Sequence, residues 1–220
     1  MCGRAVTGDV NWEQYHEWMN LLREPDAPVK PNFNNAPTTM NPIFIPDGDG
    51  IQGVMARWGL IPNWFHKPLS EMKFSTFNAR SEDAASKPTF RDAMRSQHCL
   101  VPAQGYYEWT GVKGNKTPYY ISVLTNAPAF CFAGLYTEVK LPGFVGYSYT
   151  VLTEGSQDPI KGLHHRMPVI IDEGSYDDWL GSETALTNIT RIESSRFSFH
   201  EVNAKVGNVR NNEPSLIAAV

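Results

Sequence analysis

Residues 98–112, HCLVPAQGYYEWTGV, decide the fold class, because this stretch is long and rich in residues that favour β-strands. The turn residues KGNK at 113–116 follow it, and a second apolar run, TPYYISVL, occupies residues 117–124. Two strand-forming runs joined by a glycine-containing turn predict an antiparallel hairpin.

Working outward from this hairpin, the remaining pattern predicts more strands than helices. The predicted strands cover residues 42–50, 51–62, 129–139, 147–153 and 197–203. The predicted helices cover residues 10–23, 87–97 and 172–181, the first because its apolar side chains recur at helical spacing. Strands dominate the middle of the chain, so we expect an α+β fold with a mainly antiparallel, curled or barrel-like sheet.

Length and composition narrow the class of protein. The 220 residues are 41% hydrophobic and 19% charged, contain no linker-like segment and predict a single domain over residues 1–220. No signal peptide or transmembrane run is evident, so we expect no membrane partner. Three cysteines, Cys2, Cys99 and Cys131, form no disulfide framework, which favours a reducing intracellular compartment.

The formal net charge of −4 argues mildly against a nucleic-acid partner. Local basic patches decide binding more than the total charge does, so this partner class stays open.

Cys2 follows the initiator methionine directly, in the sequence MCGR. Methionine aminopeptidases remove Met1 before a small residue, which would leave an α-amine and a thiol on adjacent carbons. The amine can form a Schiff base with an aldehyde, and the thiol can then close a five-membered thiazolidine ring. The alternatives are a small buried cysteine, or an N-terminal nucleophile hydrolase whose thiol attacks a peptide.

Two short motifs carry further candidate residues. In FNAR at 77–80, a strand would place Asn78 and Arg80 on one face, where they suit an amine and a phosphate; the alternative is a turn asparagine with a surface arginine. In GYYEW at 105–109, aromatic neighbours would raise the pKa of Glu108 and suit it to proton transfer. The alternative there is a glutamate on the solvent face, with Tyr107 and Trp109 packed inward.

The remaining candidates are histidines and exposed aromatics. His164 and His165 precede an apolar strand, and only one of two adjacent strand residues should face a given site. No CxxC, HxH or HExxH pattern is present, so we expect no metal and no other cofactor. Trp64 and Phe65 lie in a loop beside basic residues and suit stacking on unpaired bases, unless both are core aromatics.

Taken together, the motifs resemble the SOS response-associated peptidase (SRAP) family. The resemblance rests on MCGR at 1–4, FNNAP at 33–37, RWGLIPNWF at 57–65, FNARSE at 77–82, CLVPAQGYYEW at 99–109, HHRMP at 164–168 and VGNVRN at 206–211. It implies a bifurcated, barrel-containing β-structure surrounded by helices. It also implies a DNA damage response protein that binds single-stranded DNA and joins its N-terminal cysteine to the aldehyde of an abasic site as a thiazolidine.

The resemblance assigns roles to particular residues. Cys2 would be the nucleophile, Asn78 would position the amine and aldehyde, Glu108 would transfer protons and His164 would assist ring opening or reversal. The expected DNA contacts are Arg4, Asn34, Pro37, Trp64, Phe65, Arg80 and Arg166. The family name adds a peptidase activity, thought to release the protein's own Met1.

Three functions therefore stand as hypotheses. The first is a DNA–protein crosslinking enzyme with lyase-like Schiff-base chemistry, acting as a monomer in the cytoplasm or, in a bacterium, at the nucleoid. The second is a cysteine peptidase or amidohydrolase acting on peptides. The third is a noncatalytic single-strand-binding module.

Overall fold

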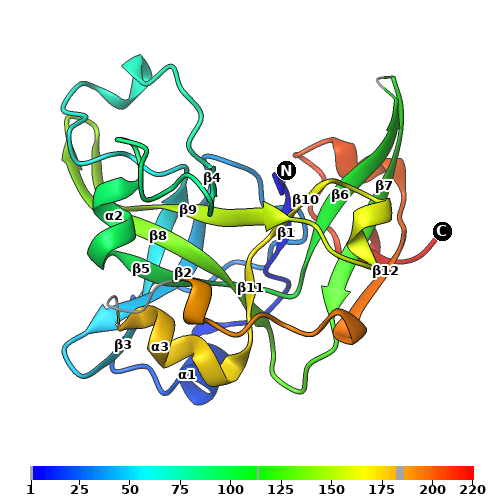
Figure 1. Ribbon diagram of the computed structural model, residues 1–220, viewed down its shortest axis with the longest axis horizontal. Coiled ribbons are helices and arrows are strands. Elements are labelled where there is room, and N and C mark those ends of the chain that lie inside the picture. The colour runs from blue at the N-terminus through cyan, green and yellow to red at the C-terminus, as the bar shows by residue number, and fades with distance from the viewer. Residues whose placement is uncertain (1, 113, 182–185) are drawn as a thin grey trace.

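A closed β-barrel forms the larger part of the molecule. The computed structural model describes residues 2–112, 114–181 and 186–220 (Figure 1). The barrel strands are β2 (Met40–Asp47), β3 (Gly50–Trp58), β5 (His98–Ala103), β8 (Phe130–Leu141) and β9 (Phe144–Gly155). Hydrogen bonds run in the order β9–β3–β2–β5–β8 and close the ring from β8 back to β9; only the β3–β9 pair is parallel.

Three short strands extend this barrel sheet. Strands β4 (Asn78–Arg80) and β10 (Arg166–Pro168) both pair with β9, and β11 (Ile170–Ile171) pairs with β8. The motifs around Asn78 and His164 are therefore brought to one strand of the barrel, although more than eighty residues separate them in the chain.

A second sheet lies beside the barrel, on the right in Figure 1. Its antiparallel order is β1 (Ala5–Val6), β6 (Gly105–Val112), β7 (Asn115–Val123) and β12 (Phe197–Glu201). The β6–β7 hairpin confirms the prediction, although Lys113 of its turn lies outside the described residues. The two sheets confirm the predicted bifurcated α+β architecture with a barrel-like core.

The stretch at 98–112 is not one strand, because it divides between the two sheets at Gln104. Strand β5 ends at Ala103 and β6 begins at Gly105. The backbone N–H of Gln104 donates to the carbonyl of Val6 at 2.7 Å, which ties the junction to β1. Glycine is required next, because a Cβ at residue 105 would lie 2.3 Å from the ring of Tyr120.

The helices are shorter than the sequence predicts. Helix α1 covers Trp12–Met19 rather than 10–23, because Asn11 caps its start and Asn20 adopts a left-handed conformation at its end. Helices α2 (Arg91–Ser96) and α3 (Tyr176–Leu180) lie within the predicted segments. Single 3-10 turns cover Leu69–Glu71, Ile160–Gly162, Glu173–Ser175, Leu186–Asn188, Ser194–Arg196, Ala204–Gly207 and Pro214–Ile217.

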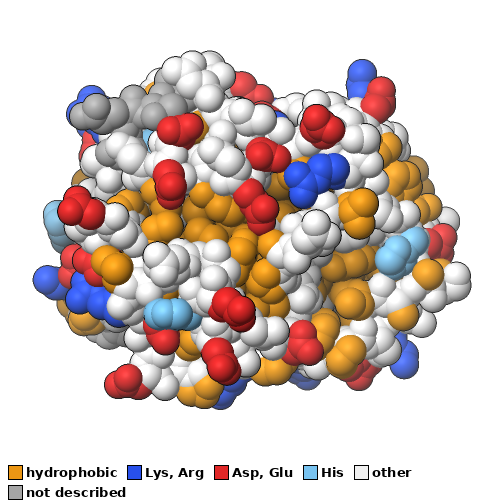
Figure 2. Space-filling model, turned by 90° about the horizontal axis from the view of Figure 1, so that it is seen from below, with side chains coloured by type: hydrophobic (Ala, Val, Ile, Leu, Met, Phe, Trp, Pro, Cys, Tyr) orange, Lys and Arg blue, Asp and Glu red, His pale blue; other side chains and the backbone are white. Residues whose placement is uncertain are grey.

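Helices α1 and α3 cover the lower side of the molecule as drawn in Figure 1. Figure 2 views this side and shows apolar side chains across its middle, with Asp and Glu side chains around them. Such a face repels phosphate, so a DNA contact is expected on another side. Within the described ranges, no helix is both long and apolar enough to cross a membrane.

Candidate active site

Cys2 lies just before β1, the strand that forms one edge of the second sheet. Its side chain is fully buried, and its Sγ contacts the carbonyl oxygen of Arg4 at 3.9 Å. Burial raises the pKa of the thiol well above its ordinary value, and the nearby carboxyl of Glu108 adds to this effect. The thiol is therefore protonated in the folded protein and needs a base before it can act as a nucleophile.

Asn78 of β4 reaches Cys2 from the barrel side. Its Nδ2 donates to the carbonyl oxygen of Cys2 at 2.6 Å. Its Oδ1 is buried and accepts no hydrogen bond from the residues that the structure describes. The amide thus fixes the Cys2 backbone and retains one buried acceptor that the protein leaves unused.

Glu108 and His164 complete the group of four residues predicted to carry the chemistry. Glu108 lies on β6 and is 4% exposed, so it is not on the solvent face. Its carboxylate Oε1 lies 3.9 Å from Nδ1 of His164, which comes from the loop before β10. The ring is oriented by the backbone N–H of Arg166, which donates to Nδ1 at 3.1 Å.

Two opposing influences set the charge of Glu108. Burial raises the pKa of its carboxyl, and the N-terminal ammonium, His164 and Lys116, in decreasing order, act in the opposite direction. A carboxyl with a raised pKa holds its proton closer to neutral pH, which suits it to act as a general acid.

An open pocket lies directly outside this group. It is lined by Gly3, Arg4, Glu108, Trp109, Lys116, His164 and Gly207. Neither Lys116 nor Trp109 figures among the site residues predicted from sequence. The proximity of Lys116 to the site depends on the β6–β7 pairing, in which it lies opposite Gly111.

Arg4, predicted to hold a phosphate, is already bound within the protein. Its Nη1 donates to Oδ1 of Asn34 at 2.7 Å and to the carbonyl of Val206 at 2.6 Å, and its Nη2 donates to the carbonyl of Gly207 at 3.1 Å. The guanidinium also lies 5.6 Å from the ring centre of Trp109. These contacts join the N-terminal segment to the C-terminal segment.

Asn34, also predicted to contact DNA, is 3% exposed. Its Nδ2 lies within hydrogen-bonding distance of the carbonyl oxygens of Val206, Asn208 and Asn211, at 3.0–3.2 Å. We therefore assign Asn34 to the support of the C-terminal segment. Pro37, from the same motif, is partly exposed and lines a groove with Phe74 and Phe77.

Arg166 is held by contacts within the protein, whereas Arg80 is exposed. Arg166 donates to both carboxylate oxygens of Glu82, at 2.6 and 2.9 Å, and to the carbonyl of Thr153. The Arg166 hydrogen bonds lower the pKa of Glu82 to about 2. Arg80 is exposed at the end of β4, on the same strand as Asn78, and is the better placed of the two to meet a phosphate.

Trp64 and Phe65 differ in exposure, although their rings meet edge to face with centres 6.3 Å apart. Trp64 is 49% exposed and stacks on Phe74 with ring centres 5.7 Å apart. Phe65 is buried with Val139 and Leu141, so the prediction that it contacts bases does not fit its place in the core. Sequence reasoning missed Phe74, an exposed aromatic in the loop before FNAR.

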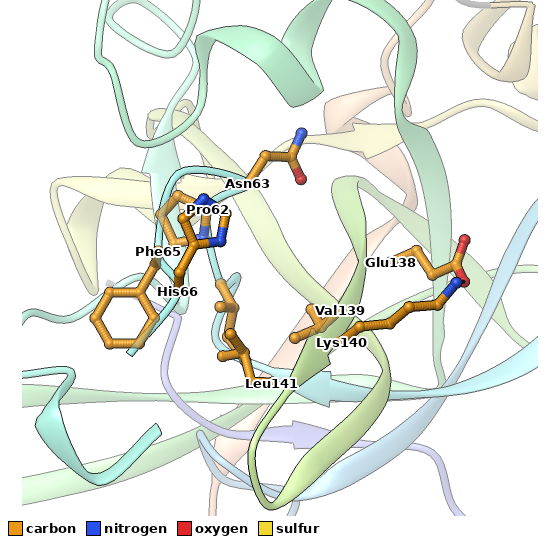
Figure 3. Close-up of a pocket in the computed structure, with 9 residues that line it drawn as sticks. Pro62, Asn63, Phe65, His66, Glu138, Val139, Lys140 and Leu141 are labelled. Carbon is orange, nitrogen blue, oxygen red and sulfur yellow. Dashed lines mark ion pairs between the residues drawn. The ribbon is translucent and has the colours of Figure 1, made fainter. Parts of the chain in front are cut away.

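Another pocket lies beside Phe65, between its loop and the end of the β8–β9 hairpin (Figure 3). It contains the Lys140–Glu138 ion pair at 3.4 Å and none of the four residues predicted to carry the chemistry. No cluster of metal-ligating side chains occurs in the part of the chain that the structure describes.

Comparison with known proteins agrees with the family resemblance drawn from the sequence. The family described as SOS response associated peptidase (SRAP) matches residues 1–209. The abasic site processing protein HMCES of Xenopus tropicalis is 32% identical over 238 residues, covering 93% of this chain and 70% of that protein. The abasic site processing protein YoqW of Bacillus subtilis (strain 168) is 30% identical over 99% of both chains.

A solved structure extends the agreement to the fold. A protein from Bordetella bronchiseptica is 26% identical, has a TM-score of 0.76, and covers 92% of this chain and all of that one. With the family match spanning nearly every described element, the chain belongs to the SOS response-associated peptidase (SRAP) family.

Proposed function

We propose that this protein binds single-stranded DNA at an abasic site and links Cys2, once Met1 has been removed, to the aldehyde of the lesion. The observation that carries the proposal is the group formed by Cys2, Asn78, Glu108 and His164, brought together from four separate segments. The relatives named as abasic site processing proteins support the lesion as substrate.

The chemistry begins at the α-amine of Cys2. The neutral amine adds to the aldehyde carbon and gives a carbinolamine. Protonated Glu108 then delivers a proton to the departing hydroxyl, so that water leaves and an iminium ion forms. The spare Oδ1 of Asn78 is the acceptor we expect to orient the amine during this step.

The carboxyl group of Glu108 also takes part in ring closure, this time as a base. The Glu108 carboxylate left by the first step accepts the thiol proton as Sγ attacks the iminium carbon, forming the C–S bond. The result is a thiazolidine and one molecule of water. Burial raises the pKa of the Cys2 thiol, so a base at this position is needed. His164, 3.9 Å from Glu108, is the residue we expect to assist the reverse reaction.

The DNA strand is proposed to pass over the exposed residues beside β4. Arg80 would hold a phosphate, and Trp64, Phe74 and Pro37 would stack against or separate bases. Release of Met1 by the protein itself is a further part of the proposal. A peptidase acting on other peptides is less well supported, because the matching relatives are named as abasic site processing proteins.

The test uses an oligonucleotide with one abasic site. Protein lacking Met1 should give an adduct that survives denaturation on a gel. Cys2→Ala should give no stable adduct but should leave a Schiff base that borohydride traps, because its α-amine survives. Cys2→Ser should also fail to give the stable ring. A heat-stable adduct of undiminished yield with Cys2→Ala would exclude the thiazolidine and point to a lysine.

A further inference from the structure

Lys116 lies at the rim of the reaction pocket but has no part in the chemistry above. It is the second residue of β7, opposite Gly111 in the hairpin, and lines the pocket with Glu108 and His164. Its side chain is exposed, and no ion pair joins it to a carboxylate of the described residues.

The other cation lining this pocket, Arg4, differs from Lys116 in being occupied. Its guanidinium makes hydrogen bonds to Asn34, Val206 and Gly207 and lies over Trp109. Three of the five N–H groups of the Arg4 guanidinium are engaged in this way, so Arg4 offers a phosphate fewer donors than an unengaged guanidinium would. Lysine, by contrast, presents a compact charge on a flexible stem and binds phosphate without a fixed geometry.

We propose that Lys116 binds the phosphate next to the abasic residue and so holds the lesion over Glu108. The proposal rests on the proposed function and adds a residue to its site. Lys116 is a positioning residue, because it contacts the DNA backbone and not the reacting carbon. The strand would then lie between Arg80, at the β4 side of the site, and Lys116, on the β6–β7 hairpin.

This contact has a consequence for Glu108. In the free protein burial raises the pKa of that carboxyl, and Lys116 is the smallest of the influences that oppose the rise, after the N-terminal ammonium and His164. A phosphate bound to Lys116 offsets its positive charge and removes part of the opposition. Binding of the strand would therefore favour the protonated form of Glu108, which is the form that the first step requires.

The first measurement is the salt dependence of binding to intact single-stranded DNA. Lys116→Gln should weaken binding and reduce the slope of log affinity against log salt by about one phosphate contact. Arg23→Gln is the control, because it removes one positive charge near α1, where Arg23 pairs with Asp47 at 2.8 Å. An equal slope for wild type and Lys116→Gln would overturn the proposal.

The second measurement separates phosphate binding from a direct effect on Glu108. Crosslinking rates are followed against pH at limiting and at saturating abasic DNA. At limiting DNA, the pH at which the rate falls should be higher in Lys116→Gln than in wild type. At saturating DNA the difference should shrink, because the phosphate offsets the lysine in the wild type, whereas in Lys116→Gln neither the lysine nor a phosphate held by it lies beside Glu108. An equal shift in both conditions would mean that Lys116 acts on Glu108 without holding phosphate.

The two proposals fail separately. A wild-type protein that forms no denaturation-resistant adduct would exclude the proposed function itself. An adduct that forms normally, with an unchanged salt slope in Lys116→Gln, would exclude the role of Lys116 alone.

Discussion

The reaction centre and the outer ledge are built in opposite ways. The reaction centre comprises Cys2, Asn78, Glu108 and His164, and its groups are largely buried and held by contacts between distant segments. The outer ledge comprises Pro37, Trp64, Phe74 and Arg80, whose side chains are exposed or partly exposed. Because the two regions share no residue, mutations should affect the crosslinking chemistry and the DNA affinity separately.

The largest expected effect is on the reaction centre. Glu108→Gln keeps the size of the side chain but cannot deliver a proton, so crosslinking should slow by about 10²-fold or more. Affinity for undamaged single-stranded DNA should hardly change. A time course of adduct formation measures the crosslinking rate, and fluorescence anisotropy measures the affinity for undamaged DNA. Equal losses of rate and affinity would make Glu108 a structural residue.

Trp64 and Phe65 give a test of the ledge with adjacent residues. Trp64→Ala should weaken binding by about 1–3 kcal/mol for a lost base stack, and it should lower the free energy of unfolding less than Phe65→Ala does, because Trp64 is 49% exposed. Phe65→Ala should instead lower the free energy of unfolding by about 3–5 kcal/mol, because it empties a core position. Urea denaturation and anisotropy distinguish the two; a reversed pattern would exchange their assigned roles.

Substitutions of Arg4 and Arg80 should likewise separate stability from DNA affinity, with smaller effects. Arg4→Ala removes three hydrogen bonds of a charged group and should cost about 2–3 kcal/mol of stability. Arg80→Ala should change stability by less than about 0.5 kcal/mol and weaken DNA binding for all sequences alike. The same denaturation and binding assays apply. Loss of sequence-independent affinity without loss of stability in Arg4→Ala would place Arg4 on the DNA.

The smallest expected effect concerns stability and pH. Burial raises the folded-state pKa of Glu108, so its contribution to stability is fully present below the ordinary glutamate pKa and is lost as pH rises through the folded value. Glu108→Gln should therefore gain stability relative to wild type as pH increases over that window. Thermal unfolding of both proteins from pH 4 upward would show it; parallel curves would contradict the raised pKa.

The sequence indicates which residues belong to the candidate site better than it indicates which of them are already bound by other parts of the protein. Strand patterns were sufficient for a barrel-like α+β fold, whereas Asn78 and Glu108 were singled out only by the resemblance of their motifs to the family. The sequence did not predict that the guanidinium of Arg4 is bound within the protein, because its partner Val206 lies 202 positions away. Arg166 meets Glu82 across 84 positions. A cation already bound by the protein looks the same in sequence as one that is available to DNA.

The sequence pattern also did not predict the point at which the chain passes from one sheet to the other. Residues 98–112 read as one continuous strand, yet Gln104 divides them between the barrel and the second sheet. The division depends on β1 reaching Gln104 through Val6 and on the ring of Tyr120 lying against Gly105. Neither partner is adjacent in sequence, so periodicity alone could not place the break.

The bond from Asn78 to Cys2 spans the two sheets. Asn78 belongs to a strand of the barrel sheet, whereas Cys2 precedes a strand of the other, and 2.6 Å separates the two polar atoms. The length of this hydrogen bond therefore depends on the separation between the two sheets. Its side-chain NH₂ resonances should shift whenever the sheets move apart, which would make this one amide a spectroscopic sensor of how tightly the protein closes around its DNA.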